Sequence, residues 1–132
     1  VLWMDSDLVE FTPTLVEDLL RVSESAIVGA AAHKIREDGL IWYDTAGFIE
    51  KGKRANTKAP WFKQPGPLIK LDSVGMCYLV PSDVYRSGVR HKHTKGFTEH
   101  YSVCADSGRE VLCDLRIKVF QADLTKFGET LH

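Results

Sequence analysis

The chain has 132 residues, 44% of them hydrophobic and 27% charged, and its 17 basic and 18 acidic side chains leave a formal net charge of -1. A chain of this length can bury a core without disulfides or a structural metal, and we expect one domain over 1–132. The balanced charge excludes a protein that binds nucleic acid by bulk electrostatics. No stretch approaches the roughly 18 consecutive apolar residues of a membrane-spanning helix.

The first segments predict an α/β fold. Residues 1–4 are apolar and indicate a short buried strand that ends at an acidic cluster. Thr12 and Pro13 predict a helix with a hydroxyl N-cap, and 25–32 predict a second buried strand. The apolar stripe of the helix consists of Leu15, Val16, Leu19 and Leu20. Because an independent domain rarely starts inside its central sheet, we expect the chain to be a fragment.

The periodic pattern fails in the middle of the chain, where glycines and prolines interrupt a mixture of lysines and aromatic residues. We therefore expect a long loop at about 33–66. Loops longer than about 12 to 15 residues in compact domains are commonly functional lids or segments without regular structure. The aromatic residues of this loop indicate that it packs on the domain or binds a ligand, and 51–64 are the candidate lid.

The second half of the chain predicts alternating strands and helices. The expected strands are 68–71, 74–80, 111–113 and 117–120, and the expected helices are 84–86 and a longer one from Glu99 to about Ser107 with Thr98 as N-cap. We expect His91, His93 and His100 to be solvated. The three cysteines, Cys77, Cys104 and Cys113, are odd in number and lack metal-site spacing, which predicts buried thiols, with one disulfide as the alternative.

Asp5 and Asp7 are the sharpest local feature, because they follow a buried apolar strand with one small residue between them. Two carboxylates in this arrangement can share a hard divalent cation such as Mn²⁺ or Mg²⁺. A cation held there stabilises a departing diphosphate. The pair alone is a weak signal, since a solvated turn gives the same letters, but the apolar run before it favours a site.

The same letters fit the opening motif of haloacid-dehalogenase-type phosphatases. In that interpretation Asp5 is the nucleophile and Asp7 the general acid/base. The phosphatase motif also requires a lysine and a paired acidic motif at the ends of later strands. The chain has no G-D-x-x-x-D sequence, and Asp114 is the acid that best fits such a position.

The order of motifs resembles the carboxyl-terminal two-thirds of a GT-A glycosyltransferase, in particular the fungal α-mannosyltransferases of the mannan polymerase complexes. The resemblance is carried by WMDSDLVEFTPTLVEDLL, IKLDSVGMCYLVPSDVYRSGV and GFTEHYSVCADSGREVLCDLRIKVF. The phrase VYRSGV at 84–89 matches that family nearly letter for letter. The resemblance implies a GT-A-like mixed sheet flanked by helices, here without the N-terminal nucleotide-binding half.

The resemblance also implies roles for individual residues. It makes Asp5 and Asp7 the site of the metal and the diphosphate, while Asp72, Ser73 and Gly75 line the donor sugar. Asp72 and Glu99 are the candidate catalytic residues, with Glu99 on the acceptor side. A purely structural role is the alternative for Glu99, because a carboxylate in the first turn favours the helix dipole.

Gln121 departs from the family pattern, in which a histidine after the last core strand completes the metal shell. The amide oxygen of Gln121 can bind a hard cation, although less strongly than imidazole binds Mn²⁺. Weaker metal binding, help from the nearby Asp123, and a non-catalytic subunit are three readings that stay open.

The implied activity is a metal-dependent transfer of a hexose, with mannose favoured, from a nucleotide diphosphate sugar such as GDP-mannose to a glycan or glycoprotein. The implied location is the Golgi lumen, and a complex with related subunits is implied as well. The second hypothesis is a glycosyltransferase-like subunit without catalytic activity. Whether transfer retains or inverts the anomeric configuration stays open.

Overall fold

The computed structural model describes residues 1–36, 39–42, 49–50, 53–54, 66–93 and 98–121. Its elements in chain order are β1 (Leu2–Met4), β2 (Leu8–Glu10), α1 (Leu15–Val22), β3 (Ile27–Arg36), β4 (Gly39–Trp42), β5 (Ile49–Glu50), β6 (Lys53–Arg54), β7 (Leu68–Lys70), β8 (Cys77–Leu79), α2 (Ser82–Arg86), α3 (Glu99–Asp106) and β9 (Val111–Gln121). Within these ranges no helix is both long and apolar enough to cross a membrane.

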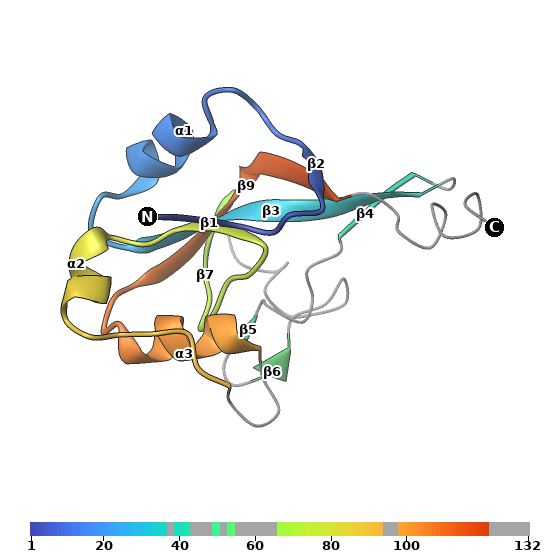
Figure 1. Ribbon diagram of the computed structural model, residues 1–132. Helices are drawn as coiled ribbons and strands as arrows, with labels where there is room; N and C mark the ends of the chain where they lie inside the picture. Colours follow the sequence, from blue (N-terminus) through green and yellow to red (C-terminus); the bar gives the residue numbers. More distant parts are fainter. Residues whose placement is uncertain (37–38, 43–48, 51–52, 55–65, 94–97, 122–132) are drawn as a thin grey trace.

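Seven strands form one mixed sheet, in which the path β1-β8-β3-β9-β2 is joined by β4 beside β3 and β7 beside β9. The long strands β3 and β9 run parallel, whereas the other neighbours are antiparallel. Helix α1 lies on one side of the sheet, and α2 and α3 lie on the other (Figure 1). The predicted α/β class is therefore confirmed, and the sheet is mixed as expected.

The apolar run of β3 explains how one strand serves both layers. Successive side chains of a strand point to opposite faces, so a strand that is covered on both sides is apolar throughout. Ile27 and Ala31 belong to the core under α2 and α3, with Val84 and Val103. Val28, Ala30 and Ala32 belong to the core under α1, which also contains Leu15 and Leu19.

Gly29 shares the face of Ile27, and its lack of a side chain is required by packing. A Cβ at this position would lie 2.7 Å from Cγ1 and 2.9 Å from Cβ of Val74. Real Cβ atoms do not approach so closely, so Val74 or the strand would have to move. The close fit of β3 against the segment before β8 therefore depends on this glycine.

We predict that Gly29→Ala lowers the free energy of unfolding by about 1 to 3 kcal/mol, the usual cost of overpacking a core. Urea unfolding followed by circular dichroism measures the loss. The control is the double variant Gly29→Ala/Val74→Ala, which removes the clashing Cγ1 atom. The double variant should lose less stability than the sum of the single variants, and strict additivity would contradict the proposed clash.

The prediction of a loop at about 33–66 is wrong for its first residues, which belong to strands. Strand β3 continues to Arg36, and it pairs with β4 so that His33 faces Trp42 and Arg36 faces Gly39. β5 and β6 form a second, two-stranded sheet. Pairing with neighbouring strands overrides the poor alternation of the local sequence. The candidate lid at 51–64 lies outside the described residues apart from β6, so it stays a prediction.

Strand β9 corrects another expectation, because 111–121 form one strand and not two. Its register with β3 jumps between Ala30↔Asp114 and Ala31↔Lys118, so the predicted break coincides with an irregularity inside one strand. The strand β2 was not predicted, and only 77–79 of the expected strand 74–80 are extended.

The helices and cysteines agree better with the sequence. Helices α2 and α3 are present, and α3 begins at Glu99 after Thr98 as predicted. Helix α1 starts later than expected, with Thr14 and not Thr12 at the N-cap, where the Thr14 hydroxyl donates to Asp18 Oδ2 at 2.9 Å. All three cysteines lie within the described ranges, are buried, and form no disulfide, which confirms the first of the two predictions for them.

Candidate functional site

Asp5 and Asp7 lie in the turn that joins β1 to β2. The backbone N–H of Asp5 donates to the carbonyl of Met76 at 2.8 Å. Met76 has φ 60°, a left-handed conformation that a non-glycine residue adopts rarely, and Cys77 N–H closes the turn by donating to Gly75 O at 2.7 Å. Gly75 therefore belongs to the same turn as Met76, whose carbonyl accepts the hydrogen bond from Asp5.

The surroundings of Asp5 disfavour its negative charge. Partial burial raises the pKa of Asp5, and the nearby carboxylates of Asp7 and Glu99 raise it further, whereas His100 acts in the opposite direction. A carboxylate in such a position gains from any cation that replaces the lost hydration. The charges of Asp7 and Glu99 thus both act on Asp5.

We predict that Asp5→Asn raises the melting temperature at pH 7. The pKa of Asp5 is raised in the folded state, so its contribution to stability is fully present below the unfolded pKa and is lost as the pH rises through the folded pKa. Asparagine does not ionise and escapes this loss. Thermal unfolding between pH 3 and 8 should give a variant whose advantage over the wild type appears only above the unfolded pKa of about 3.9. A constant difference across the range would contradict the assignment.

Asp7 meets Gln121 because Leu8, the next residue, pairs with Gln121 at the end of β9. The amide Nε2 of Gln121 donates a short hydrogen bond to Asp7 Oδ2. Gln121 is only 6% exposed, and its Oε1 has no hydrogen-bond partner in the described part of the chain. A half-turn of the amide would exchange the two atoms and direct an oxygen ligand toward Asp7. The predicted proximity of these two residues is present.

The donor set fits a hard cation only when Gln121 is counted. Among the described residues, no group of three or more His, Cys, Asp or Glu side chains is arranged to hold a metal ion. Two carboxylates and one amide oxygen would leave further positions for the oxygens of a bound diphosphate, as Mg²⁺ and Mn²⁺ sites commonly do. Asp123, the alternative ligand, lies outside the described residues.

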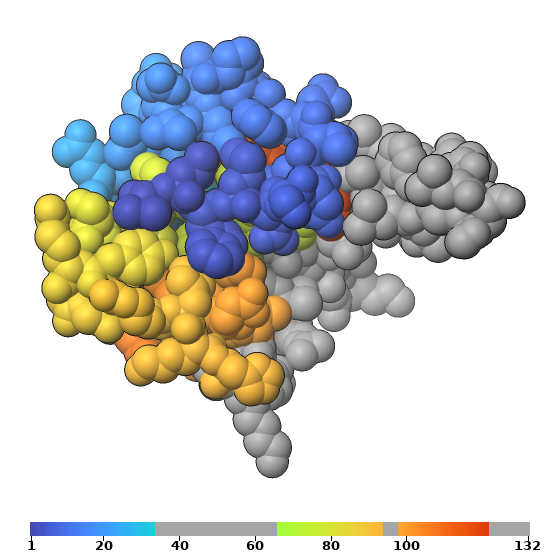
Figure 2. Space-filling view, in the orientation of Figure 1, coloured from blue at the N-terminus to red at the C-terminus, as the bar shows by residue number. Residues whose placement is uncertain are grey.

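A cluster of aromatic and histidine side chains adjoins Asp5. Trp3 stacks on His91, with ring centroids 4.1 Å apart, and meets the edge of His100 at 5.5 Å. The prediction of solvated histidines is wrong for His100, which is 7% exposed, and for the half-buried His91, but it holds for His93. In Figure 2 the surface of the first residues lies beside that of α3, as these ring contacts require.

Glu99 is exposed at the first position of α3. Its Oε1 lies 3.9 Å from Nε2 of His100, whose ring packs against Trp3. The start of α3 is thereby brought to the end of β1. The hydroxyl of Thr98 is buried without a hydrogen-bond partner in the described ranges, so Thr98 marks the helix start without capping it through its side chain.

Asp72 and Ser73, the residues predicted to line the donor sugar, differ in exposure. Asp72 is exposed and lines a separate hollow with Lys70, Tyr101 and Arg109. Ser73 is fully buried, and its hydroxyl donates to Val74 O at 3.3 Å. Its side chain therefore faces the core and is not accessible to a donor sugar, which corrects that prediction for the Ser73 hydroxyl.

Asp114, on which the phosphatase interpretation depends, serves another purpose. It is buried and accepts hydrogen bonds from Arg116 Nε at 3.0 Å and Nη2 at 2.8 Å, and these contacts lower the pKa of its carboxyl. It lines a hollow together with Asp18 and Arg21 of α1, on the other side of the sheet from α3. Its carboxylate is engaged there by an arginine.

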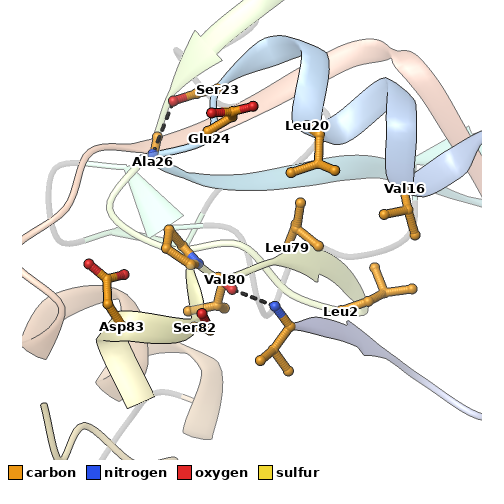
Figure 3. Close-up of a pocket in the computed structure, with 12 residues that line it drawn as sticks. Leu2, Val16, Leu20, Ser23, Glu24, Ala26, Leu79, Val80, Ser82 and Asp83 are labelled. Atoms are coloured by element: carbon orange, nitrogen blue, oxygen red, sulfur yellow. Dashed lines mark hydrogen bonds between the residues drawn. The ribbon is translucent and has the colours of Figure 1, made fainter. Parts of the chain in front are cut away.

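A further groove explains the exposed half of the helix stripe. Val16 and Leu20 of α1 are 38% and 42% exposed, and Figure 3 shows them above Leu2 and Leu79, where they line an apolar groove. The N-terminal amine of the chain donates to Val80 O at 2.7 Å along this groove. Glu24 and Asp83 are the acidic side chains that line this groove.

Comparison with protein-family models and with curated proteins finds no match for this chain.

Proposed function

We propose that the protein is a divalent-cation-dependent glycosyltransferase of GT-A type, which moves a hexose from a nucleotide diphosphate sugar to a glycan or glycoprotein. One arrangement supports the proposal: Asp5 and Asp7 lie in the turn after β1, Gln121 at the end of β9 donates to Asp7, and the charge of Glu99 acts on Asp5. The motif order that resembles the fungal α-mannosyltransferases favours GDP-mannose as donor. The same resemblance favours the Golgi lumen and a complex with related subunits.

In this mechanism the acidic turn serves the leaving group. When bound, a Mn²⁺ or Mg²⁺ ion would supply the charge that stabilises the departing diphosphate. Asp5 and Asp7 would hold the ion through their carboxylates, and Gln121 would offer Oε1 after its amide has turned. The partial burial that raises the pKa of Asp5 also lowers the local dielectric, which strengthens the attraction between carboxylate and cation.

Glu99 serves the acceptor. Its carboxylate is exposed and lies beside His100, which is under the electrostatic influence of Asp5. From there it can orient an acceptor hydroxyl or accept its proton as the new glycosidic bond forms. Asp72 lines a different hollow, so we assign the proton transfer to Glu99.

The test uses Trp3, which lies two residues before Asp5. In a variant with Trp42→Phe and Trp61→Phe, Trp3 is the remaining tryptophan of the three. Paramagnetic Mn²⁺ should quench its fluorescence, and Mg²⁺ should reverse the quenching by competition. The same protein should release GDP from GDP-mannose when a mannan acceptor and Mn²⁺ are present. If Mn²⁺ causes no quenching and no metal-dependent release of GDP is detected, the proposal is refuted.

The hydrogen bond from Gln121 to Asp7 favours a second candidate, a non-catalytic subunit. The amide satisfies Asp7 without any cation, as expected of a site that has lost its metal. This candidate predicts a folded protein without GDP release, in which Gln121→His introduces Mn²⁺ binding. Hydrolysis of simple phosphomonoesters without sugar transfer would instead favour the phosphatase.

A further inference from the structure

A buried polar chain connects the sheet to Glu99. The hydroxyl of Tyr78 in β8 lies 2.8 Å from Nδ1 of His100, and Tyr78 is fully buried. On the other side of the ring, Nε2 of His100 faces Glu99 Oε1 at 3.9 Å. The proposed function gives no role to either Tyr78 or His100.

The contacts of Tyr78 define which nitrogen of His100 carries the proton. Burial raises the pKa of Tyr78, so the phenol keeps its hydrogen, and burial lowers the pKa of His100, so the imidazole is neutral at pH 7. The phenol hydroxyl could also accept from Nδ1, but its own hydrogen would then need a second acceptor, so donation from Tyr78 to Nδ1 is the direction that satisfies both groups. A neutral imidazole with Nδ1 as acceptor carries its hydrogen on Nε2.

Glu99, which faces Nε2, and Asp5 are the two acids that act on His100. Glu99 and Asp5 both favour the imidazolium and raise the pKa of His100, but burial outweighs them. His91 packs at right angles to the ring, with centroids 6.0 Å apart, and Trp3 covers another side. The neutral ring therefore presents a single N–H to an acidic neighbourhood.

We propose that His100 is a positioning residue, which Tyr78 holds in the Nε2–H tautomer so that it directs the carboxylate of Glu99. The separation of 3.9 Å exceeds a hydrogen bond, and catalytic hydrogen bonds are often long before substrate binds. The tautomer and the contact with Glu99 are properties of the free protein. Their consequence for sugar transfer rests on the proposed function.

The first measurement is the nitrogen chemical shift pattern of ¹⁵N-histidine-labelled protein at pH 7. His100 should show the Nε2–H tautomer, whereas the exposed His93 serves as the control for an unconstrained ring. Tyr78→Phe keeps the buried ring and removes the hydroxyl, so the tautomer of His100 should become mixed. An imidazolium or an Nδ1–H tautomer in the wild type would overturn the proposal.

A matched pair of substitutions tests the contact with Glu99. His100→Gln keeps a donor near the position of Nε2, whereas the shorter side chain of His100→Asn places its amide near Nδ1 and does not reach the position of Nε2. At pH 7, the side-chain carboxyl ¹³C chemical shift of Glu99 should move in the Asn variant and stay near its wild-type position in the Gln variant, because only Gln keeps a donor beside Glu99 Oε1. An unmoved Glu99 carboxyl signal in the Asn variant would overturn the proposal, even in an active enzyme.

The transfer assay separates this inference from the proposed function. In an active protein, His100→Asn should lower kcat by roughly tenfold or more at an unchanged KM for the donor, and His100→Gln should restore most of it. A wild-type protein that transfers no sugar refutes the glycosyltransferase proposal. The two nuclear magnetic resonance measurements need no substrate, and they decide the role of His100 toward Glu99 in either case.

Discussion

Asp7→Asn is expected to abolish cation-dependent binding of the nucleotide sugar while leaving the fold intact. Asparagine keeps the shape of the side chain in the turn before β2 but removes the charge that would hold the cation in the proposed site. Substituting a residue that only hydrogen-bonds to a metal ligand commonly lowers metal affinity by about 10- to 100-fold. For a direct ligand we therefore expect cation-dependent donor affinity to fall by at least about 100-fold. Isothermal titration of GDP-mannose with and without Mn²⁺ measures this loss.

We expect Asp7→Asn to lose donor binding without losing stability against unfolding. Asp7 raises the pKa of Asp5, which reports repulsion between the two carboxylates, and the substitution relieves it. The matched control is Asp106→Asn at the exposed end of α3, where the carboxylate lies 3.7 Å from Lys92 Nζ. An Asp7→Asn protein with wild-type donor affinity, or a control with the same loss, would remove Asp7 from the site.

The parts of the fold that could be predicted are those whose local pattern agrees with their packing. The run around Ile27 and Val28 is apolar on both faces, and the strand is indeed covered by helices on both sides. The hairpin of β3 and β4 could not be predicted, because its hydrogen bonds come from strand pairing and not from an alternating sequence. Similarly, the irregular register of β9 near Asp114 gave the appearance of two strands.

The candidate site divides in the same way. Asp5 and Asp7 are neighbours in sequence, so their turn could be predicted, and the resemblance placed Gln121 near them. The inward position of Ser73 could not be predicted, because it depends on how the segment before β8 packs under α3. His100 carried a signal that was overlooked: Val103 and Cys104 follow it at i+3 and i+4, which places all three on one buried helical face.

Glu99→Gln is expected to lower the rate of sugar transfer by about 10² or more while donor binding stays near the wild-type value. Glutamine preserves the length of the side chain and can still contact His100, but it cannot accept the proton of an acceptor hydroxyl. In the proposed mechanism, donor binding depends on Asp5, Asp7 and the cation. It should therefore be insensitive to a group that acts on the acceptor.

A structural role for Glu99 predicts the opposite pair of results. Glu99 occupies the first turn of α3, where a carboxylate complements the helix dipole and contributes roughly 0.3 to 1 kcal/mol. If this were its whole role, Glu99→Gln would lower the melting temperature slightly and leave transfer almost unchanged. Glu110→Gln is a useful control, because Glu110 is an exposed acid that pairs with Lys70 at 2.9 Å outside the proposed site. Melting temperature and transfer rate measured together on both variants decide the role of Glu99, since a stable and fully active Glu99→Gln protein excludes it from catalysis.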